Sequence, residues 1–267
     1  MEESIRTSVA VVIPARLKST RFPEKPLALI RGREMILYVA EVAGKAVGRE
    51  RTYVATDSNR IAQVVRRAGY SVVLTSERAL TGTDRVSEAS KNIPVEILVN
   101  VQGDEPLLDP EDIRRIIRVK QEYPDHVING MHPISDREDP ESVNIPKVVV
   151  NESDDLIYMS RRALPGYKDL SKRPSVYLKQ VCIYAYTRQQ LQAFSDFRRK
   201  STLEEHEDIE ILRFLDLKIP VKMVMTGQVS VAVVVPSDIE EVEKILTQQS
   251  GEKGTPPLSP ELQEGFA

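Results

Sequence analysis

Positively charged side chains are concentrated near the N-terminus, directly after an apolar run at residues 9–13, VAVVI. The cations are Arg16, Lys18, Arg21 and Lys25. A short run rich in β-branched residues is typical of a strand that is buried on both faces. Prolines stiffen the loop that follows, and Ser19 offers an amide and a hydroxyl to phosphate oxygens. The loop is therefore either a polyanion site or a solvated basic loop.

An acidic pair follows a second apolar run. Residues 96–101 have a strand pattern, and the segment Gln102–Pro106, QGDEP, comes directly after it. Ligands of open parallel sheets bind where the strands end, so Asp104 would lie at that edge. Its carboxylate is the kind of oxygen ligand that Mg²⁺ prefers. The alternative is a turn aspartate that hydrogen-bonds its own backbone.

Apolar spacing predicts that strands and helices alternate in the first half of the chain. Strand patterns lie at residues 9–13, 51–57, 71–74 and 96–101, and helical patterns lie at 35–47, at 61–68 and after Asp109. This alternation predicts right-handed βαβ units around a parallel sheet. The polar segments that follow the first and fourth strands would then meet at one edge of that sheet.

The second half has more strand patterns and fewer helices. Strands are expected at residues 147–150, 156–159, 180–186 and 221–225, and helices at 202–213 and 239–246. This half would add strands and a lobe to the sheet. In the first of these helices Glu204, Glu207 and Glu210 would share one sector of the surface. They are either solvated or face a cationic or hydroxyl-bearing group.

The composition limits the classes of function. The chain has 267 residues and a formal net charge of −3, which argues against a general nucleic-acid or membrane-surface binder. Cys182 is the only cysteine and lies in an apolar run, so a buried thiol is expected and a disulfide framework is excluded. No signal sequence or run of about 20 apolar residues is present, which predicts a cytoplasmic protein.

The basic loop does not match the common phosphate-binding motifs, because neither GxGxxG nor GxxxxGK[ST] is present. Instead, IPARLKSTRFPEKPLA resembles the opening of the CMP-KDO synthetases, IPAR-x-x-STR-x-P-x-KPL. The resemblance implies that Arg16 and Lys25 contact the triphosphate of CTP and act in catalysis. It also places Ser19 in the nucleotide site.

Two further segments extend this resemblance through the first half. VNVQGDEP at residues 99–106 matches the family segment residue for residue, which implies that Asp104 holds a catalytic Mg²⁺ and that Gln102 lies in the nucleotide site. TGTDR at 81–85 is similar to the family's SGTER loop and implies that Thr83 and Arg85 bind the nucleotide. An arginine suits cytosine, because that base presents two acceptors. By itself, TGTDR is only a loop followed by a helix cap.

The second half resembles the family's acceptor-binding and dimerising half. YMSR at residues 158–161 is similar to YFSR, whose arginine contacts the sugar acid, so Arg161 is a candidate for that role; by type alone it is a surface arginine at a strand end. Residues 179–186, KQVCIYAY, are similar to K-H-x-G-IY-x-Y and imply that Gln180 and Tyr184 bind the acceptor. The acidic helix implies the same for Glu210.

The chain departs from the family pattern at positions that should select substrate and metal. Gln180 replaces a usual histidine, Cys182 a glycine, and Ile211 a common glutamine. Near the C-terminus, VVVPSD replaces V-D-T-P-E-D, so Val234 stands where the family has its second metal-binding aspartate. Asp238 matches the later aspartate and is interpreted as the start of a helix.

The resemblance implies an α/β fold with a mostly parallel, Rossmann-like nucleotide-binding sheet flanked by helices and a smaller α+β lobe. We expect one domain over residues 1–247, with a nucleotide-binding part at about 9–125 and an acid-binding and dimerising part at about 126–247. Residues 248–267 are expected to form a flexible tail.

The expected function is transfer of CMP from CTP to the anomeric hydroxyl of a 3-deoxy-ulosonic acid, KDO or a relative, with release of pyrophosphate. Mg²⁺ would be the cofactor, and the protein would be a homodimer. Val234 supports an alternative, a catalytically weakened homologue that binds nucleotide or sugar acid as a regulator. Gln180 and Ile211 support another, a nucleotidyltransferase with a different acid acceptor.

Overall fold

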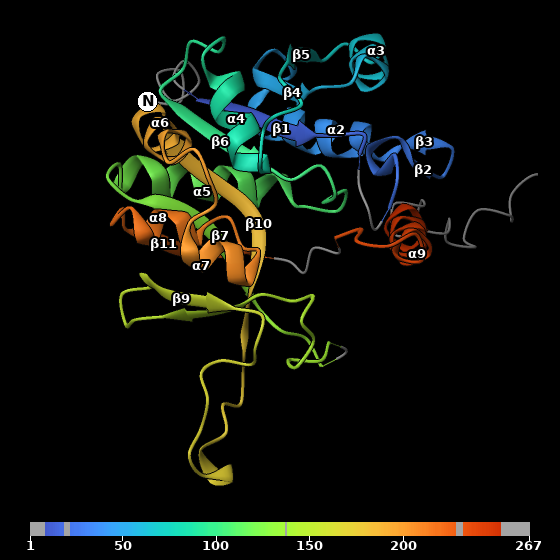
Figure 1. Ribbon diagram of the computed structural model, residues 1–267. Helices are drawn as coiled ribbons and strands as arrows, with labels where there is room; N and C mark the ends of the chain where they lie inside the picture. Colours follow the sequence, from blue (N-terminus) through green and yellow to red (C-terminus); the bar gives the residue numbers. More distant parts are fainter. Residues whose placement is uncertain (1–8, 19–21, 137, 228–231, 252–267) are drawn as a thin grey trace, which may run out of the picture.

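A computed structural model describes residues 9–18, 22–136, 138–227 and 232–251 (Figure 1). Its central sheet runs in the order β11 (Val221–Met225), β7 (Val127–Pro133), β10 (Leu178–Thr187), β6 (Ile97–Val101), β1 (Val9–Ala15), β4 (Thr52–Thr56) and β5 (Ser71–Leu74). Strands β6, β1, β4 and β5 are parallel, as the alternating pattern predicts. The α/β fold with a mostly parallel nucleotide-binding type of sheet is confirmed.

One continuous sheet joins the two halves of the chain. Strand β10, from the second half, pairs antiparallel with β6 on one side and with β7 on the other. Strand β8 (Lys147–Val150) pairs with β10 and with β9 (Leu156–Ser160), and β11 runs parallel to β7. The carboxyl end of β6 therefore lies directly beside strands of the second half.

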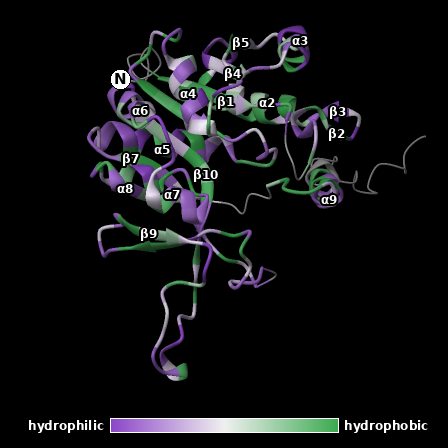
Figure 2. Ribbon diagram, viewed as in Figure 1, coloured by the Kyte–Doolittle hydropathy of each residue, from purple (hydrophilic) through white to green (hydrophobic). Residues whose placement is uncertain are grey.

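Strand β1 separates two hydrophobic cores because its side chains alternate between the faces of the sheet. Val9, Val11 and Ile13 pack on one face with residues of α2 (Met35–Val47), α3 (Asn59–Arg67) and α5 (Pro110–Glu122). Ala10 and Val12 pack on the other face, which α4 (Gly82–Ser90) and α6 (Arg188–Asp196) cover. Figure 2 also shows hydrophobic residues along β10, in the middle of the sheet.

The helix starts follow the capping residues in the sequence. Asp109 accepts a hydrogen bond from the Glu111 amide at 2.8 Å, and Pro110 occupies the first position of α5, as predicted. Ser58 caps α3 through the Ile61 amide. Thr81 caps α4, so the segment 81–85 forms the first turn of a helix.

The single helix predicted at residues 202–213 is wrong. Two short helices, α7 (Thr202–Glu207) and α8 (Leu212–Asp216), replace it, because Asp208 adopts the left-handed conformation with φ of 51° and ends α7. Aspartate is one of the few residues that tolerate this conformation. Glu210 therefore does not lie on the same helix as Glu204 and Glu207, and the three carboxylates bond to different parts of the protein.

An arm formed by residues 161–177 projects from the body of the molecule (Figure 1). It carries the short helix η3 (Leu170–Lys172), and the side chains of Leu170 and Val176 are 74% and 54% exposed. It leaves the sheet between β9 and β10. This is the segment of the second half that reaches furthest from the two cores.

The C-terminal helix α9 (Asp238–Gly251) packs beside the hairpin of β2 (Leu29–Ile30) and β3 (Arg33–Glu34). Because α9 continues to Gly251, the tail predicted from residue 248 starts inside a helix; residues 252–267 lie outside the described residues. No helix in the described part of the chain is long and apolar enough to span a membrane.

Two short helices complete the set of elements. They are η1 (Lys25–Leu27) and η2 (Arg49–Arg51). The first begins at Lys25, one of the predicted triphosphate ligands, and has Pro26 at a first-turn position. Proline suits that position because its fixed φ matches a helix start and its missing N–H is not needed there.

Candidate functional site

Lys25 and Asp104 form an ion pair at the carboxyl edge of the sheet. The Lys25 Nζ lies 2.5 Å from Asp104 Oδ2, although the two residues are 79 positions apart. Their side chains remain 20% and 27% exposed, so both face a space that a ligand can reach. The structure thus brings together the two residues that the sequence assigned to the triphosphate and to the metal.

The C-terminal turn lies against the same pair. The Val233 amide donates to the Asp104 carbonyl at 2.9 Å, and the Val233 carbonyl accepts from Lys25 Nζ at 3.0 Å. Position 234 therefore lies next to Asp104, but valine has no atom that binds a cation. Asp238 accepts hydrogen bonds from the amides of Val234 and Val235 at 2.7 and 2.9 Å, which agrees with its interpretation as the start of α9.

The oxygen ligands around Asp104 fit a Mg²⁺ ion that also binds substrate phosphates. Among the described residues, no group of three or more histidine, cysteine or acidic side chains could hold a metal ion. Mg²⁺ keeps several waters and is often bound by one or two carboxylates together with substrate phosphates. Asp104 therefore suits an ion that it shares with a triphosphate, and the set does not form an all-protein cage.

The basic loop is only partly within the described residues. Arg16 follows β1 and is exposed, and its guanidinium makes no hydrogen bond to another residue in the described ranges. Lys18 pairs with Glu77 at 3.0 Å on the surface. Ser19 and Arg21 lie outside the described residues. Arg16 is thus a cation at the carboxyl end of β1 without a fixed partner in those ranges.

The first turn of α4 brings together residues assigned to the nucleotide and to the acceptor. Glu210 accepts hydrogen bonds from the amides of Gly82 at 3.0 Å and Thr83 at 2.7 Å. A Cβ at Gly82 would lie 2.9 Å from Gln102 Nε2, so Gln102 packs directly against this turn. Burial raises the pKa of the Glu210 carboxyl, and the two amides act against that shift. This contact joins residues at least 127 positions apart and was not predicted from the sequence.

Arg85 is buried and held by the ends of two strands. Its side chain, in a residue only 3% exposed, donates to Thr75 Oγ1 at 2.6 Å and to Asp57 Oδ2 at 2.9 Å. Asp57 and Thr75 follow β4 and β5 directly. In this structure Arg85 braces the carboxyl edge, and its role in binding cytosine remains a prediction.

Arg161 bonds to backbone carbonyls around the end of α7. Its Nε donates to the Glu207 carbonyl at 2.5 Å, and its two terminal nitrogens donate to the carbonyls of Val143 at 2.8 Å and Asp208 at 3.0 Å. A guanidinium at a helix C-terminus satisfies carbonyls that lack intrahelical partners. Contact of Arg161 with an acid acceptor remains a prediction.

The predicted acceptor residues of β10 lie around an irregularity in that strand. The register with β7 shifts between Val181 and Tyr184. Buried Asn129 fills the irregularity, because its Nδ2 donates to the carbonyls of Val181 and Ile183 at 3.0 and 2.9 Å. Gln180 Nε2 donates to Asn129 Oδ1 at 2.9 Å. Gln180 is thereby oriented by a residue that the sequence analysis missed.

Cys182 lies in β10 between Gln180 and Tyr184, near the carboxylates of Glu105 and Asp104. Burial raises the pKa of its thiol, and the nearby carboxylates of Glu105 and Asp104 raise it further, with a smaller effect of Glu210. Burial also raises the pKa of the Tyr184 hydroxyl. The raised pKa keeps the thiol protonated at neutral pH, which is not the state of a nucleophile. The residue is only partly buried, whereas the sequence predicted a buried thiol.

A buried ion network joins α4 to α7 and α8. Arg213, which is fully buried, binds Glu204 through two hydrogen bonds of 2.6 and 2.7 Å. It also donates to Asp84 at 3.0 and 3.2 Å and stacks on Phe194. The sequence analysis missed Arg213, and the acidic residues that need a cationic partner were the only available signal.

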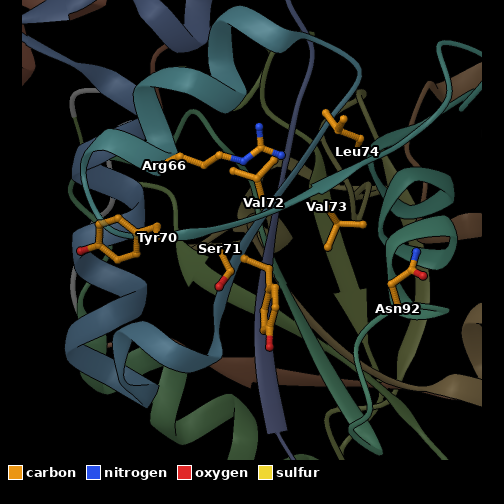
Figure 3. A pocket seen from close by; sticks show the side chains of 8 residues that line it. Arg66, Tyr70, Ser71, Val72, Val73, Leu74 and Asn92 are labelled. Carbon is orange, nitrogen blue, oxygen red and sulfur yellow. The ribbon is translucent and has the colours of Figure 1, made fainter.

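A hollow at the outer edge of the sheet lies apart from these clusters. It surrounds β5, where Figure 3 shows Arg66, Tyr70 and Asn92 around Val72 and Val73. None of the residues predicted to bind nucleotide or acceptor lines it. The candidate site is therefore the carboxyl edge around Lys25 and Asp104, and this hollow is not part of it.

A basic loop after the first strand, a carboxylate after a parallel neighbour and an extra antiparallel strand beside it define an α/β protein with a charged ligand site at the carboxyl edge of its sheet. Comparison with protein families gives the family. Residues 10–223 match the model of the cytidylyltransferase family, and the chain belongs to that family.

Two relatives and one solved structure are similar to this protein over most of its length. A 3-deoxy-manno-octulosonate cytidylyltransferase of Bdellovibrio bacteriovorus is 37% identical, across 89% of this chain and 97% of its own. An 8-amino-3,8-dideoxy-manno-octulosonate cytidylyltransferase of Shewanella baltica is 36% identical, across 90% and 98%. The structure of CMP:2-keto-3-deoxy-manno-octonic acid synthetase complexed with CTP is similar with a TM-score of 0.83 at 34% identity, covering 91% of this chain and 100% of that one.

Proposed function

We propose that this protein transfers CMP from CTP to the anomeric hydroxyl of a 3-deoxy-ulosonic acid and releases pyrophosphate. The observation that carries the proposal is the Lys25–Asp104 pair at the carboxyl edge of the sheet, where the exposed cation Arg16 follows β1. The relatives named for CTP and for octulosonic acids support the choice of both substrates.

The reaction needs no covalent intermediate with the protein. The acceptor oxygen forms a bond to the α-phosphorus of CTP, the bond from that phosphorus to the bridging oxygen breaks, and pyrophosphate leaves with the electron pair. The hydroxyl proton goes to solvent. Catalysis then depends on positioning the reactants and neutralising developing charge, which Arg16 and Lys25 would do on the triphosphate.

Asp104 would hold a Mg²⁺ ion together with phosphate oxygens. When bound, the ion neutralises charge on the triphosphate. Ser19, Thr83, Arg85 and Gln102 would bind the nucleotide, and Arg161, Gln180, Tyr184 and Glu210 would bind the acceptor. The contact of Gln102 with the first turn of α4, which also contacts Glu210, supports a shared nucleotide and acceptor site.

The proposal is tested by measuring pyrophosphate release with CTP and Mg²⁺ over a panel of acids. The panel contains 3-deoxy-manno-octulosonate, its 8-amino-3,8-dideoxy form and other ulosonates. Release with one of them in the wild type, and loss of about 100-fold or more in Arg16→Ala and Asp104→Ala, is the expected result. Wild-type rates in both variants would overturn the proposal.

A second candidate function follows from Val234. A homologue without a second acidic ligand beside Asp104 could bind CTP as a regulator and turn it over weakly. This candidate predicts CTP binding without pyrophosphate release at high Mg²⁺, and release in Val234→Asp. Release by the wild type at a rate equal to that of the variant excludes it.

The choice of acceptor is tested at Gln180, whose amide is fixed by Asn129. If Gln180 selects the acceptor, Gln180→His should change the preference between the two octulosonates. The proposal also includes a homodimer, which the exposed Leu170 and Val176 of the arm support, and a cytoplasmic location, where CTP is available. Ultracentrifugation of the wild type tests the dimer.

A further inference from the structure

The ammonium of Lys25 occupies the cation-binding side of Asp104. It lies 2.5 Å from Asp104 Oδ2 and 3.0 Å from the Val233 carbonyl, so two of its three donors are used at this point. The backbone closes the arrangement, because the Val233 amide donates to the Asp104 carbonyl. A lysine side chain therefore sits between the carboxylate and the C-terminal turn, where a bound cation would make the same contacts.

Among the described residues, Lys25 is the cationic side chain that forms an ion pair with Asp104. Position 234 is a valine, and Asp238 is bonded to the amides of the turn. In the part of the chain that the structure describes, no group of three or more metal-binding side chains exists. The charge of Asp104 is thus balanced by Lys25.

We propose that Lys25 is a counter-ion switch that keeps Asp104 from divalent cations until a triphosphate draws the ammonium away. The inference rests on the proposed function, since it assumes that the triphosphate binds at this edge. Nucleotide therefore binds before a divalent ion or together with it, and the protein alone binds such ions weakly.

The charges favour this exchange. Two cations on one carboxylate repel each other, and this repulsion is stronger near a protein surface than in bulk water. A triphosphate carries more negative charge than one aspartate, so Lys25 gains by moving to it. The lysine side chain has a flexible chain of four carbons, and its ammonium group is partly exposed. The ammonium can therefore move without disturbing the hydrophobic core.

The turn itself keeps its position during the exchange. The contact between the Val233 amide and the Asp104 carbonyl does not involve the ammonium. The Val233 side chain is fully buried with Ile30, Met35 and Val242. Only the lysine head has to move, which distinguishes this switch from a movement of the C-terminal helix.

The test measures Mn²⁺ binding by electron paramagnetic resonance, without nucleotide, in the wild type and in Lys25→Met. We expect Lys25→Met to bind Mn²⁺ about tenfold more tightly or better than the wild type. The double variant Lys25→Met/Asp104→Asn should lose that gain, which assigns the ion to Asp104. Lys18→Met is the matched control, because Lys18 pairs with exposed Glu77 and should leave Mn²⁺ binding unchanged.

Equal Mn²⁺ affinity in the wild type and Lys25→Met would overturn the switch, and so would a gain that survives the loss of Asp104. These measurements contain no CTP, so their outcome is independent of turnover. CTP binding in EDTA, measured by calorimetry on the wild type, tests the proposed function separately. Circular dichroism of each variant confirms that the compared proteins are folded.

Discussion

The carboxylate of Glu210 accepts a hydrogen bond of 2.7 Å from the amide of Thr83, in the first turn of α4. From the sequence, Thr83 is predicted to bind the nucleotide and Glu210 the acceptor. Their contact makes the two assignments interdependent, because a ligand that moves one residue moves the partner of the other. It also places an anion at a helix N-terminus, where backbone amides and the helix dipole favour negative charge.

Gly82→Ala should weaken CTP binding while changing stability little. The added Cβ would lie 2.9 Å from Gln102 Nε2 and 3.4 Å from Glu210 Oε1, so the flexible end of Gln102 has to move. We expect a several-fold increase in the KM for CTP and a loss of less than about 1 kcal/mol in the free energy of unfolding. Gly166→Ala, where a Cβ has open space, is the control. An unchanged KM would remove Gln102 from the nucleotide site.

Arg213→Met should destabilise the protein strongly. The change leaves the buried carboxylate of Glu204 and the partly buried carboxylate of Asp84 without their cation, and breaking a buried pair in this way costs about 3 to 5 kcal/mol. Urea denaturation of the wild type and the variant measures the difference. Arg114→Met is the control, because its pair with Glu111 is exposed and should matter by less than about 1 kcal/mol. Similar losses in both variants would contradict the assigned role.

Lys120 should make the free energy of unfolding increase as the pH rises above about 8. Burial lowers the pKa of its ammonium from 10.5 to about 8. Between these values the unfolded chain holds a proton that the folded chain has released, so this group adds stability as pH rises through 8 towards 10.5. We expect wild type to gain about 1 to 3 kcal/mol over Lys120→Met between pH 8 and pH 10.

Comparing the two proteins isolates Lys120, because other titrating groups are common to both. The same ammonium donates to the carbonyls of Pro124 and His126 and to Gln190 Oε1, so Lys120→Met should also be less stable at neutral pH. Urea denaturation at several pH values measures both effects. A difference that does not change with pH would show that Lys120 stays charged in the folded protein.

Arg161→Gln should lower the free energy of unfolding by about 1 to 3 kcal/mol, because two backbone carbonyls at the end of α7 and the Val143 carbonyl lose a charged donor. Thermal or urea denaturation checks this result. The KM for the acid acceptor, measured on the same variant, tests the separate prediction that Arg161 binds it. Full stability in Arg161→Gln would contradict the capping role.

The local sequence pattern predicted an element correctly where residues close along the chain set its conformation. The apolar run of β1, the Asp109–Pro110 start of α5 and the strand β8 all form as predicted, because burial and capping act within a few residues. The helix at 202–213 failed for the opposite reason. Glu204 turns inward to Arg213, while Glu207 bonds to Ser160 and to the Arg161 amide, so tertiary contacts override helical spacing.

The sequence by itself determined the class of protein, because the segments after β1 and β6 resemble those of the CMP-KDO synthetases and a parallel sheet brings such positions to one edge. Only the tertiary structure decided how the charges are used. It pairs Lys25 with Asp104, Glu210 with α4 and Arg161 with carbonyls. Partners separated by many residues are chosen by packing and desolvation, and these act only once the chain has folded.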